Sequence, residues 1–282
     1  MVGPHRNCEG LFAYRNPRKF AMIDTVETTV ISTRMSDHIV ILRLNRPSKR
    51  NAINNHMLQS LASEVLAAEA DGHVRCLILT GGPNCFSAGS DIKEIQKDGI
   101  SAIQNKRRME HWAVIEATHI PIVAAVSGVC FGGGHELVML CDVVIASENA
   151  IFGQPEIKLG HIPGDGATQR LSRLVGKYAA MKMILTGEPV DADTALSLGL
   201  ASEVICQEDY ETRAKEIAEL IARHSGKALG YAKEAINTAY ELPLSLGLER
   251  ERQNIKSAFL SSDQKEGLAA FIEKRKPNFK DE

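Results

Sequence analysis

The middle of the chain contains a glycine-rich turn between an apolar run and a helical pattern. Residues 122–126 read IVAAV, residues 128–136 read GVCFGGGHE, and Leu137, Leu140 and Cys141 then recur at helical spacing. Glycines let a backbone approach a ligand closely, and a helix start leaves free N–H donors at the positive end of its dipole. The stretch therefore predicts a strand, a ligand-binding turn and a helix, in that order.

The same alternation extends to both sides of this stretch. Residues 30–33 and 39–44 are β-rich runs separated by a polar tripeptide and predict a hairpin, while residues 55–70 and 106–117 have helical spacing and residues 76–79 and 143–146 are strand-length apolar runs. Strands that alternate with helices predict an α/β fold with mostly parallel pairing. Helical patterns dominate after residue 208, with breaks near Gly226, Pro243 and residues 261–263. We expect an N-terminal extension over residues 1–25, a core over 26–208 and a helical domain over 209–282.

Composition limits the class of protein. The chain has 282 residues, 44% of them hydrophobic, which is enough for one large core or one core with a small appended domain. The 33 basic and 35 acidic residues give a net charge of −2, so neither nucleic acid nor an anionic membrane is an expected partner. No apolar run approaches the roughly 18 residues of a membrane helix, so we expect a soluble protein.

The cysteines and the N-terminus bear on the compartment. Six cysteines are scattered without a CxxC pair, which favours reduced thiols in a cytoplasmic protein over disulfides or a zinc site. The first twenty residues are basic and contain no serine, so this extension fits either an unusual transit peptide or a misassigned start upstream of Met22.

A second junction resembles the first. Residues 86–91 read FSAGSD and precede the helical IKEI of residues 92–95. Two such junctions that face each other could form an oxyanion hole, in which one donor is typically worth about 3 kcal/mol of barrier. Either junction alone is more typical of a tight turn. A zinc protease is excluded because Met139 stands where the HExxH motif beginning at His135 needs histidine.

A third segment contributes a carboxyl group. Residues 152–160 read FGQPEIKLG and place Glu156 between Pro155 and Ile157. Partial burial in such a stretch raises the pKa of a carboxyl group toward the range useful for acid–base catalysis. Taken alone, a glutamate in this setting is more typical of the surface.

Together, these segments resemble the enoyl-CoA hydratase/isomerase, or crotonase, superfamily. The resemblance runs from about Thr29 to Lys280. It is carried by the glycine triplet at 132–134, Glu136, Cys141-Asp142, FGQPE at 152–156, Pro163-Gly164 and TQRL at 168–171, and further by LNRP at 44–47, Asn51-Ala52, AGSD at 88–91, LTG at 185–187 and FIEKR at 271–275.

The resemblance implies a spiral core of ββα turns with a helical C-terminal domain that mediates homotrimers, usually paired into homohexamers. It implies an enoyl-CoA hydratase, which adds water in syn fashion to a trans-2-enoyl-CoA thioester. The backbone N–H groups of Ala88 and Gly133 would hold the thioester oxygen. Glu136 would help to take a proton from water, and Glu156 would deliver one to the α-carbon.

The remaining expected contacts involve substrate and coenzyme A, which is part of the substrate. They are assigned to Ser90, Asp91, Gly164, Phe271 and Lys274, the last two from the C-terminal helix and possibly of a neighbouring subunit. Lys274 also fits an ordinary solvated face. Neither a metal nor a redox cofactor is expected, because proton transfers and backbone donors suffice for the reaction.

The chain departs from common hydratases at four positions, Ser90, His135, Asp165 and Ala167. His135 is more typical of a packed or capping residue than of a catalyst. Asp165 could face the acyl pocket, where it would raise the pKa of Glu156 or bind a polar acyl group. It could equally cap the helix that begins near Ala167.

Two other functions compete with hydration. A double-bond isomerase would use Glu156 alone, with Glu136 as a bystander, but the presence of both glutamates favours the hydratase. A non-catalytic acyl-CoA-binding or RNA-binding protein is the alternative from another class, and the net charge of −2 argues against RNA binding.

Overall fold

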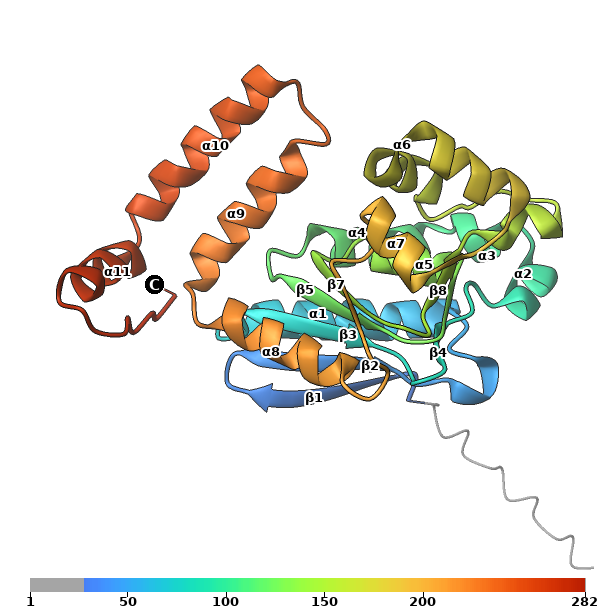
Figure 1. Cartoon of the computed structure of the whole chain (residues 1–282), viewed down its shortest axis with the longest axis horizontal. Coiled ribbons are helices and arrows are strands. Elements are labelled where there is room, and N and C mark those ends of the chain that lie inside the picture. Colours follow the sequence, from blue (N-terminus) through green and yellow to red (C-terminus); the bar gives the residue numbers. More distant parts are fainter. Residues whose placement is uncertain (1–27, 282) are drawn as a thin grey trace, which may run out of the picture.

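Two β-sheets form the centre of the protein, which we describe from a computed structural model over residues 28–281 (Figure 1). The larger sheet has the order β1-β2-β3-β5-β7-β10, with β1 and β2 antiparallel and the rest parallel. Its strands are β1 (Val30–Ser36), β2 (Ile39–Leu44), β3 (Cys76–Thr80), β5 (Ile122–Val126), β7 (Val143–Ser147) and β10 (Glu203–Ile205). The predicted hairpin and the predicted parallel strands are confirmed.

The smaller sheet was not predicted. It has the order β4-β6-β8-β9, formed by β4 (Cys85–Ser87), β6 (Val129–Phe131), β8 (Ile151–Gly153) and β9 (Val190–Asp191). The chain passes from β3 to β4, from β5 to β6 and from β7 to β8, so each pair gives one strand to each sheet before a helix follows. This repeated ββα path is the spiral that the family resemblance implied.

Helices cover the sheets and continue beyond them. They are α1 (Asn55–Asp71), α2 (Ile92–Asp98), α3 (Ser101–Gln104), α4 (Lys106–Ala117), α5 (Gly133–Val138), α6 (Ala167–Thr186), α7 (Ala192–Leu198), α8 (Tyr210–Ala222), α9 (Gly226–Thr238), α10 (Leu244–Phe259) and α11 (Ser262–Ile272), with 3-10 turns η1 (Pro47–Lys49) and η2 (Pro155–Leu159). Helix α1 shows how the local sequence sets the limits of a helix. The Asn54 side chain accepts a hydrogen bond from the N–H of Met57 at the start of α1, and Gly72 ends the helix with φ 70°. Leu58, Leu61 and Val65 are buried on one face of it.

The position of α8 corrects the expected domain boundary. Residues Tyr210, Ala214 and Ala218 of this helix belong to a buried cluster with strands of the larger sheet, so α8 is part of the core. Helices α9, α10 and α11 extend away from the core (Figure 1). The projecting helical part therefore begins at α9, not at residue 209, and the predicted breaks near Gly226, Pro243 and residues 261–263 coincide with the starts of α9, α10 and α11.

Two further expectations concern the ends of the chain and membranes. The extension over residues 1–25 lies outside the described residues. Between residues 28 and 281 there is no helix whose length and apolar character would let it cross a membrane.

Candidate active site

The two glycine-rich junctions lie side by side because β4 and β6 are parallel neighbours. Gly89 has φ 103°, and a Cβ atom there would stand 3.0 Å from the carbonyl oxygen of Phe131. Gly132 has φ 49°, and a Cβ atom there would stand 2.6 Å from Oε1 of Glu156. Both junctions thus need glycine for backbone conformation and for close approach.

The structure corrects one of the two expected oxyanion donors. The N–H of Ala88 donates to the carbonyl oxygen of Arg50 at 2.9 Å, so it is not available to a ligand. Ser90 pairs with Ile53 in a parallel β-bridge. The N–H of Ile53 donates to the carbonyl oxygen of Gly89, and the N–H of Asp91 donates to the carbonyl oxygen of Ile53. In such a bridge the residue between the two bonded ones, here Ser90, directs its own N–H away from Ile53.

Ser90 and Gly133 are the donors that remain. Within residues 28–281, neither N–H has a hydrogen-bond acceptor, and a Cβ atom on Gly133 would lie 3.5 Å from the nitrogen of Ser90. Gly133 is also the first residue of α5, where helix N–H groups point outward. Ser90 therefore replaces Ala88 as the candidate partner of Gly133, and the oxyanion hole stays a prediction.

Glu136 lies on α5 and is 2% exposed. Its Oε1 accepts the backbone N–H groups of Asp165 and Ala167, each at 2.9 Å. Burial raises the pKa of Glu136 to about 8, and the negative charge of Asp165 adds to the increase, while the two N–H donors oppose it. Glu136 therefore holds a proton more tightly than an ordinary glutamate does.

Glu156 lies in the first turn of η2, and burial also raises its pKa. The side-chain amide of Gln154 stands between Glu156 and His135. In the amide orientation that satisfies both neighbours, its nitrogen donates to Oε1 and Oε2 of Glu156 at 3.2 Å, and its oxygen accepts from Nδ1 of His135 at 3.3 Å. His135 is buried against Phe152, with 5.5 Å between ring centroids, and burial lowers its pKa to about 4. The expectation of a packed rather than catalytic histidine matches this position.

Both glutamates line one pocket with a cavity volume of about 60 Å³. Ala88, Ser90, Gly164 and Asp165 line the same pocket, so most of the predicted site residues are brought together. The rest of the lining is largely apolar and includes Ile92, Ile95, Ile103, Leu159 and Ile162. The pocket therefore combines an apolar wall with two protonatable carboxyl groups beside two free amides.

Asp165 does not cap α6. The N-cap residue is Gly166, without a side-chain hydrogen bond, and the Asp165 carboxylate instead pairs with the buried guanidinium of Arg108 at 2.5 Å. The capping alternative is therefore wrong, and Asp165 lies in the pocket. Its charge raises the pKa of Glu136 and, as a smaller cause, that of Glu156. Arg108 was not singled out in the sequence, because nothing near residue 108 marks it as buried.

Three predicted contact residues lie elsewhere. The Asp91 carboxylate caps α2 by accepting from the N–H of Lys93 at 3.1 Å and pairs with Arg46 at 2.9 Å, so its side chain serves the fold. Phe271 is 83% exposed on α11, and Lys274 follows the same helix, which projects from the core far from α2 and α3 at the pocket (Figure 1). Neither residue lines the pocket.

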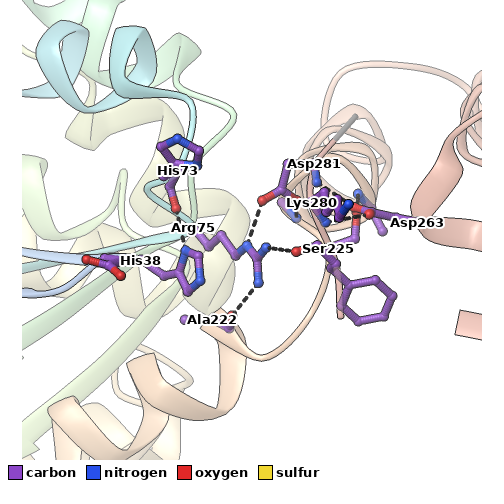
Figure 2. Close-up of polar contacts among 12 residues, drawn as sticks. His38, His73, Arg75, Ala222, Ser225, Asp263, Lys280 and Asp281 are labelled. Atoms are coloured by element: carbon purple, nitrogen blue, oxygen red, sulfur yellow. Dashed lines mark hydrogen bonds and ion pairs between the residues drawn. The ribbon is translucent and has the colours of Figure 1, made fainter. Parts of the chain in front are cut away.

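A larger cavity of about 510 Å³ lies between the core and α9, and neither Glu136 nor Glu156 lines it. Beside it, Figure 2 shows the Arg75 guanidinium between the core and the C-terminal segment. Its Nε donates to Oδ2 of Asp281 at 2.7 Å, and its other nitrogens donate to the carbonyl oxygens of Ala222 and Phe279. This network joins the last described residues to the core, and its charged side chains bond to one another and to backbone carbonyl groups.

Metal binding has no evident place in the described part of the chain. No group of three or more His, Cys, Asp or Glu side chains in residues 28–281 is arranged to hold a metal ion. The expectation that the reaction uses no metal or redox cofactor stays a prediction.

Comparisons with known proteins agree with this geometry. The family model described as "Enoyl-CoA hydratase/isomerase" matches residues 34–282. The chain belongs to this family, as its motifs indicated.

Similar enzymes include the 2,3-dehydroadipyl-CoA hydratase of Escherichia coli, 43% identical over 86% of this chain and 95% of that protein. The mitochondrial enoyl-CoA hydratase of Pongo abelii is 41% identical over 94% of this chain and 92% of that protein. A crystal structure of an enoyl-CoA hydratase from Bacillus anthracis superposes with a TM-score of 0.85 at 35% identity, over 90% of this chain and 100% of that one. This chain is therefore an enzyme of the enoyl-CoA hydratase kind. Since some similar proteins are named mitochondrial, the cytoplasmic location stays a prediction.

Proposed function

We propose that this protein is an enoyl-CoA hydratase that adds water to a trans-2-enoyl-CoA thioester and forms a 3-hydroxyacyl-CoA. The observation that supports it best is the meeting of two carboxyl groups, Glu136 and Glu156, in one pocket beside the free amides of Ser90 and Gly133. Isomerisation needs a single proton carrier, whereas hydration needs one group to deprotonate water and another to protonate carbon.

The proposed reaction begins with the thioester carbonyl oxygen at the Ser90 and Gly133 amides. Water forms a bond to the β-carbon and gives a proton to the Glu136 carboxylate, while the electron pair of the double bond moves onto the thioester as an enolate. The two N–H donors stabilise the enolate oxygen in this step. Glu156 then delivers its proton to the α-carbon, and because both carboxyl groups line the same pocket, hydroxyl and hydrogen arrive on one face.

Each glutamate has structural support for its part. Two backbone N–H groups hold Oε1 of Glu136, which leaves Oε2 for the water and stabilises the ionised form when it is needed. The Gln154 amide holds Glu156 against Gly132. The reaction adds the elements of water with no net oxidation or reduction of the substrate and needs only proton transfers, so we propose that no metal or redox cofactor takes part.

We also propose that the active protein is a homotrimer or homohexamer. Phe271 lies on α11 and Lys274 just after it, and this helix projects away from the pocket, so the two residues could meet coenzyme A only at a neighbouring subunit (Figure 1). The projecting helices also expose many apolar side chains, as an association surface does. They include Ile236, Leu244, Leu246, Ile255, Phe259, Leu260, Leu268, Phe271 and Ile272.

The test follows the loss of the enoyl thioester absorbance with crotonyl-CoA. We expect turnover by the wild type and a loss of about 10²–10⁴-fold in kcat for Glu136→Gln and for Glu156→Gln. Glu148→Gln, which changes an exposed glutamate outside the pocket, is the matched control and should keep full activity. Isomerisation of a 3-enoyl-CoA without hydration would replace the proposal with the isomerase, and binding of acetoacetyl-CoA without turnover would leave only a binding protein.

A further inference from the structure

A buried arginine stands behind the proposed acid–base pair. The side chain of Arg108 on α4 is 2% exposed, and its Nη2 donates to Oδ2 of Asp165 at 2.5 Å. The guanidinium lies 5.9 Å from the ring centroid of Trp112, and its only other hydrogen bond among the described residues is a long one, 3.4 Å, to Asn55. Since a buried charge is costly without a partner, Arg108 and Asp165 depend on each other.

The pair is linked to Glu136 in two ways. The backbone N–H of Asp165 donates to Oε1 of Glu136, so the residue that holds Arg108 also holds the glutamate. The Asp165 carboxylate is close enough for its negative charge to disfavour ionisation of Glu136. Arg170 fixes the same loop from the other side by donating to the carbonyl oxygen of Asp165 at 3.0 Å.

We propose that Arg108 is a positioning residue that, through its ion pair with Asp165, sets the orientation and the charge state of Glu136. The inference rests on the proposed function for its catalytic meaning. The guanidinium offsets the negative charge that Asp165 brings next to Glu136. It also holds the Asp165 loop where the amides of Asp165 and Ala167 meet Oε1 of Glu136.

The charge balance around Glu136 supports this assignment. Several charged or titratable groups lie on the segments around it: Arg108 on α4, His135 on α5, Glu156 on η2, His161 after η2, Asp165 before α6 and Arg170 on α6. His135 is neutral at pH 7 because burial lowers its pKa to about 4. Two carboxyl groups therefore oppose ionisation of Glu136, and Arg108 is the buried cation that offsets one of them.

The test measures the titration of Glu136 itself. Full-length protein labelled with ¹³C at the side-chain carboxyl of glutamate is titrated by NMR, and the Glu136 signal is assigned by its absence in Glu136→Gln. In Asp165→Asn, the Arg108 cation is unopposed, so the midpoint of Glu136 should fall by a pH unit or more. In Arg108→Gln, Asp165 is unopposed, so the last proton of the Glu136–Asp165 cluster should leave at a higher pH than in the wild type.

Two further variants separate electrostatics from damage to the fold. The double variant Arg108→Gln/Asp165→Asn replaces the ion pair by a neutral hydrogen-bonding pair and should return the midpoint toward that of the wild type. Arg108→Lys keeps the charge and should shift it less than Arg108→Gln. Asp281→Asn breaks another buried arginine–aspartate pair, remote from the pocket, and should leave the midpoint unchanged.

The outcomes are distinct. Shifts of opposite sign in the two single variants, with recovery in the double variant, would support the inference. Unmoved midpoints, or shifts of the same sign, would overturn it, and if a single variant does not fold, Arg108→Lys and the double variant still decide. The NMR titration needs no turnover, so a wild type that fails to hydrate crotonyl-CoA would refute the proposed function without affecting this result. With turnover present, Arg108→Lys should lower kcat more than it changes KM, because Arg108 does not line the pocket.

Discussion

Glu156 lies against Gly132 so closely that a Cβ atom on the glycine would stand 2.6 Å from the glutamate Oε1. The glycine at this position therefore leaves room for the Glu156 carboxyl group as well as forming the turn. In Gly132→Ala, the methyl group would push the Glu156 carboxyl group away from the reacting carbon. We expect kcat for crotonyl-CoA hydration to fall at least about 100-fold, since small displacements of a catalytic group have effects of this size.

Gly72→Ala is the matched control for backbone strain. Gly72 has φ 70°, and no atom lies within 4 Å of the position that its Cβ would take. Alanine there should cost about 1–2 kcal/mol of folding free energy for its left-handed conformation and leave kcat unchanged. A Gly132→Ala enzyme with normal kcat would mean that Glu156 is not a proton donor or acceptor in the reaction.

The pH dependence of hydration should be bell-shaped. The pKa values of Glu136 and Glu156 are both raised, and their carboxyl groups interact, so they lose their protons in two coupled steps. Hydration needs one proton on the pair, and kcat/KM should therefore fall on the alkaline side near pH 8, where burial places the pKa of Glu136. A profile of kcat/KM for crotonyl-CoA between pH 5 and 10 measures this.

The Glu136→Gln variant provides the check on that profile. It should lose the alkaline limb near pH 8 in its residual activity, because the group that releases the last proton is gone. An alkaline limb at the same pH in this variant would assign the titration to another group.

Much of the site could be predicted from the family resemblance, because that resemblance is carried by contiguous motifs. Glu136 follows a glycine triplet and Glu156 follows Gln-Pro, and both proved to line one pocket. The error over Ala88 arose because the direction of an amide depends on which segment pairs beside it. The 50–53 segment that binds Ala88 is remote in sequence from the FSAGSD junction.

The larger sheet could be predicted where strands were long and apolar, and the smaller sheet could not. Strands β4, β6 and β8 have three residues each, β6 lies between two glycines and β8 ends in one, so these strands carry too little periodicity to be recognised. The same limit applies to Arg108, whose partner Asp165 is 57 residues away. Its burial is a consequence of how α4 and the loop before α6 pack together.

His135 should make the fold sensitive to acid. Burial lowers its pKa to about 4 from an ordinary value of 6.5. Between these two pH values the histidine binds a proton in the unfolded chain but stays neutral in the folded protein. The stability present above pH 6.5 is therefore lost progressively as the pH falls toward 4, by about 2 kcal/mol at pH 5. Urea unfolding of the wild type and of His135→Gln at pH 7 and pH 5 measures this contribution.

The comparison needs a second histidine. His224 is exposed, so His224→Gln should keep the wild-type difference between the two pH values, whereas His135→Gln should reduce it. An undiminished acid loss in His135→Gln would place the sensitivity in other groups.

The Arg75–Asp281 pair should anchor the C-terminal segment to the core (Figure 2). Arg75 also donates to the carbonyl oxygens of Ala222 and Phe279, and Asp263 accepts the backbone N–H groups of Lys280 and Asp281, so α11 and the tail are held together. In Arg75→Gln, the buried Asp281 carboxylate loses its cation, which typically costs about 3–5 kcal/mol. Hydrogen exchange should then rise in residues 262–281 but not around Glu136, because the cavity beside Arg75 is separate from the catalytic pocket. Exchange that rises equally at Glu136 would instead mean that the C-terminal helices and the active site unfold as one unit.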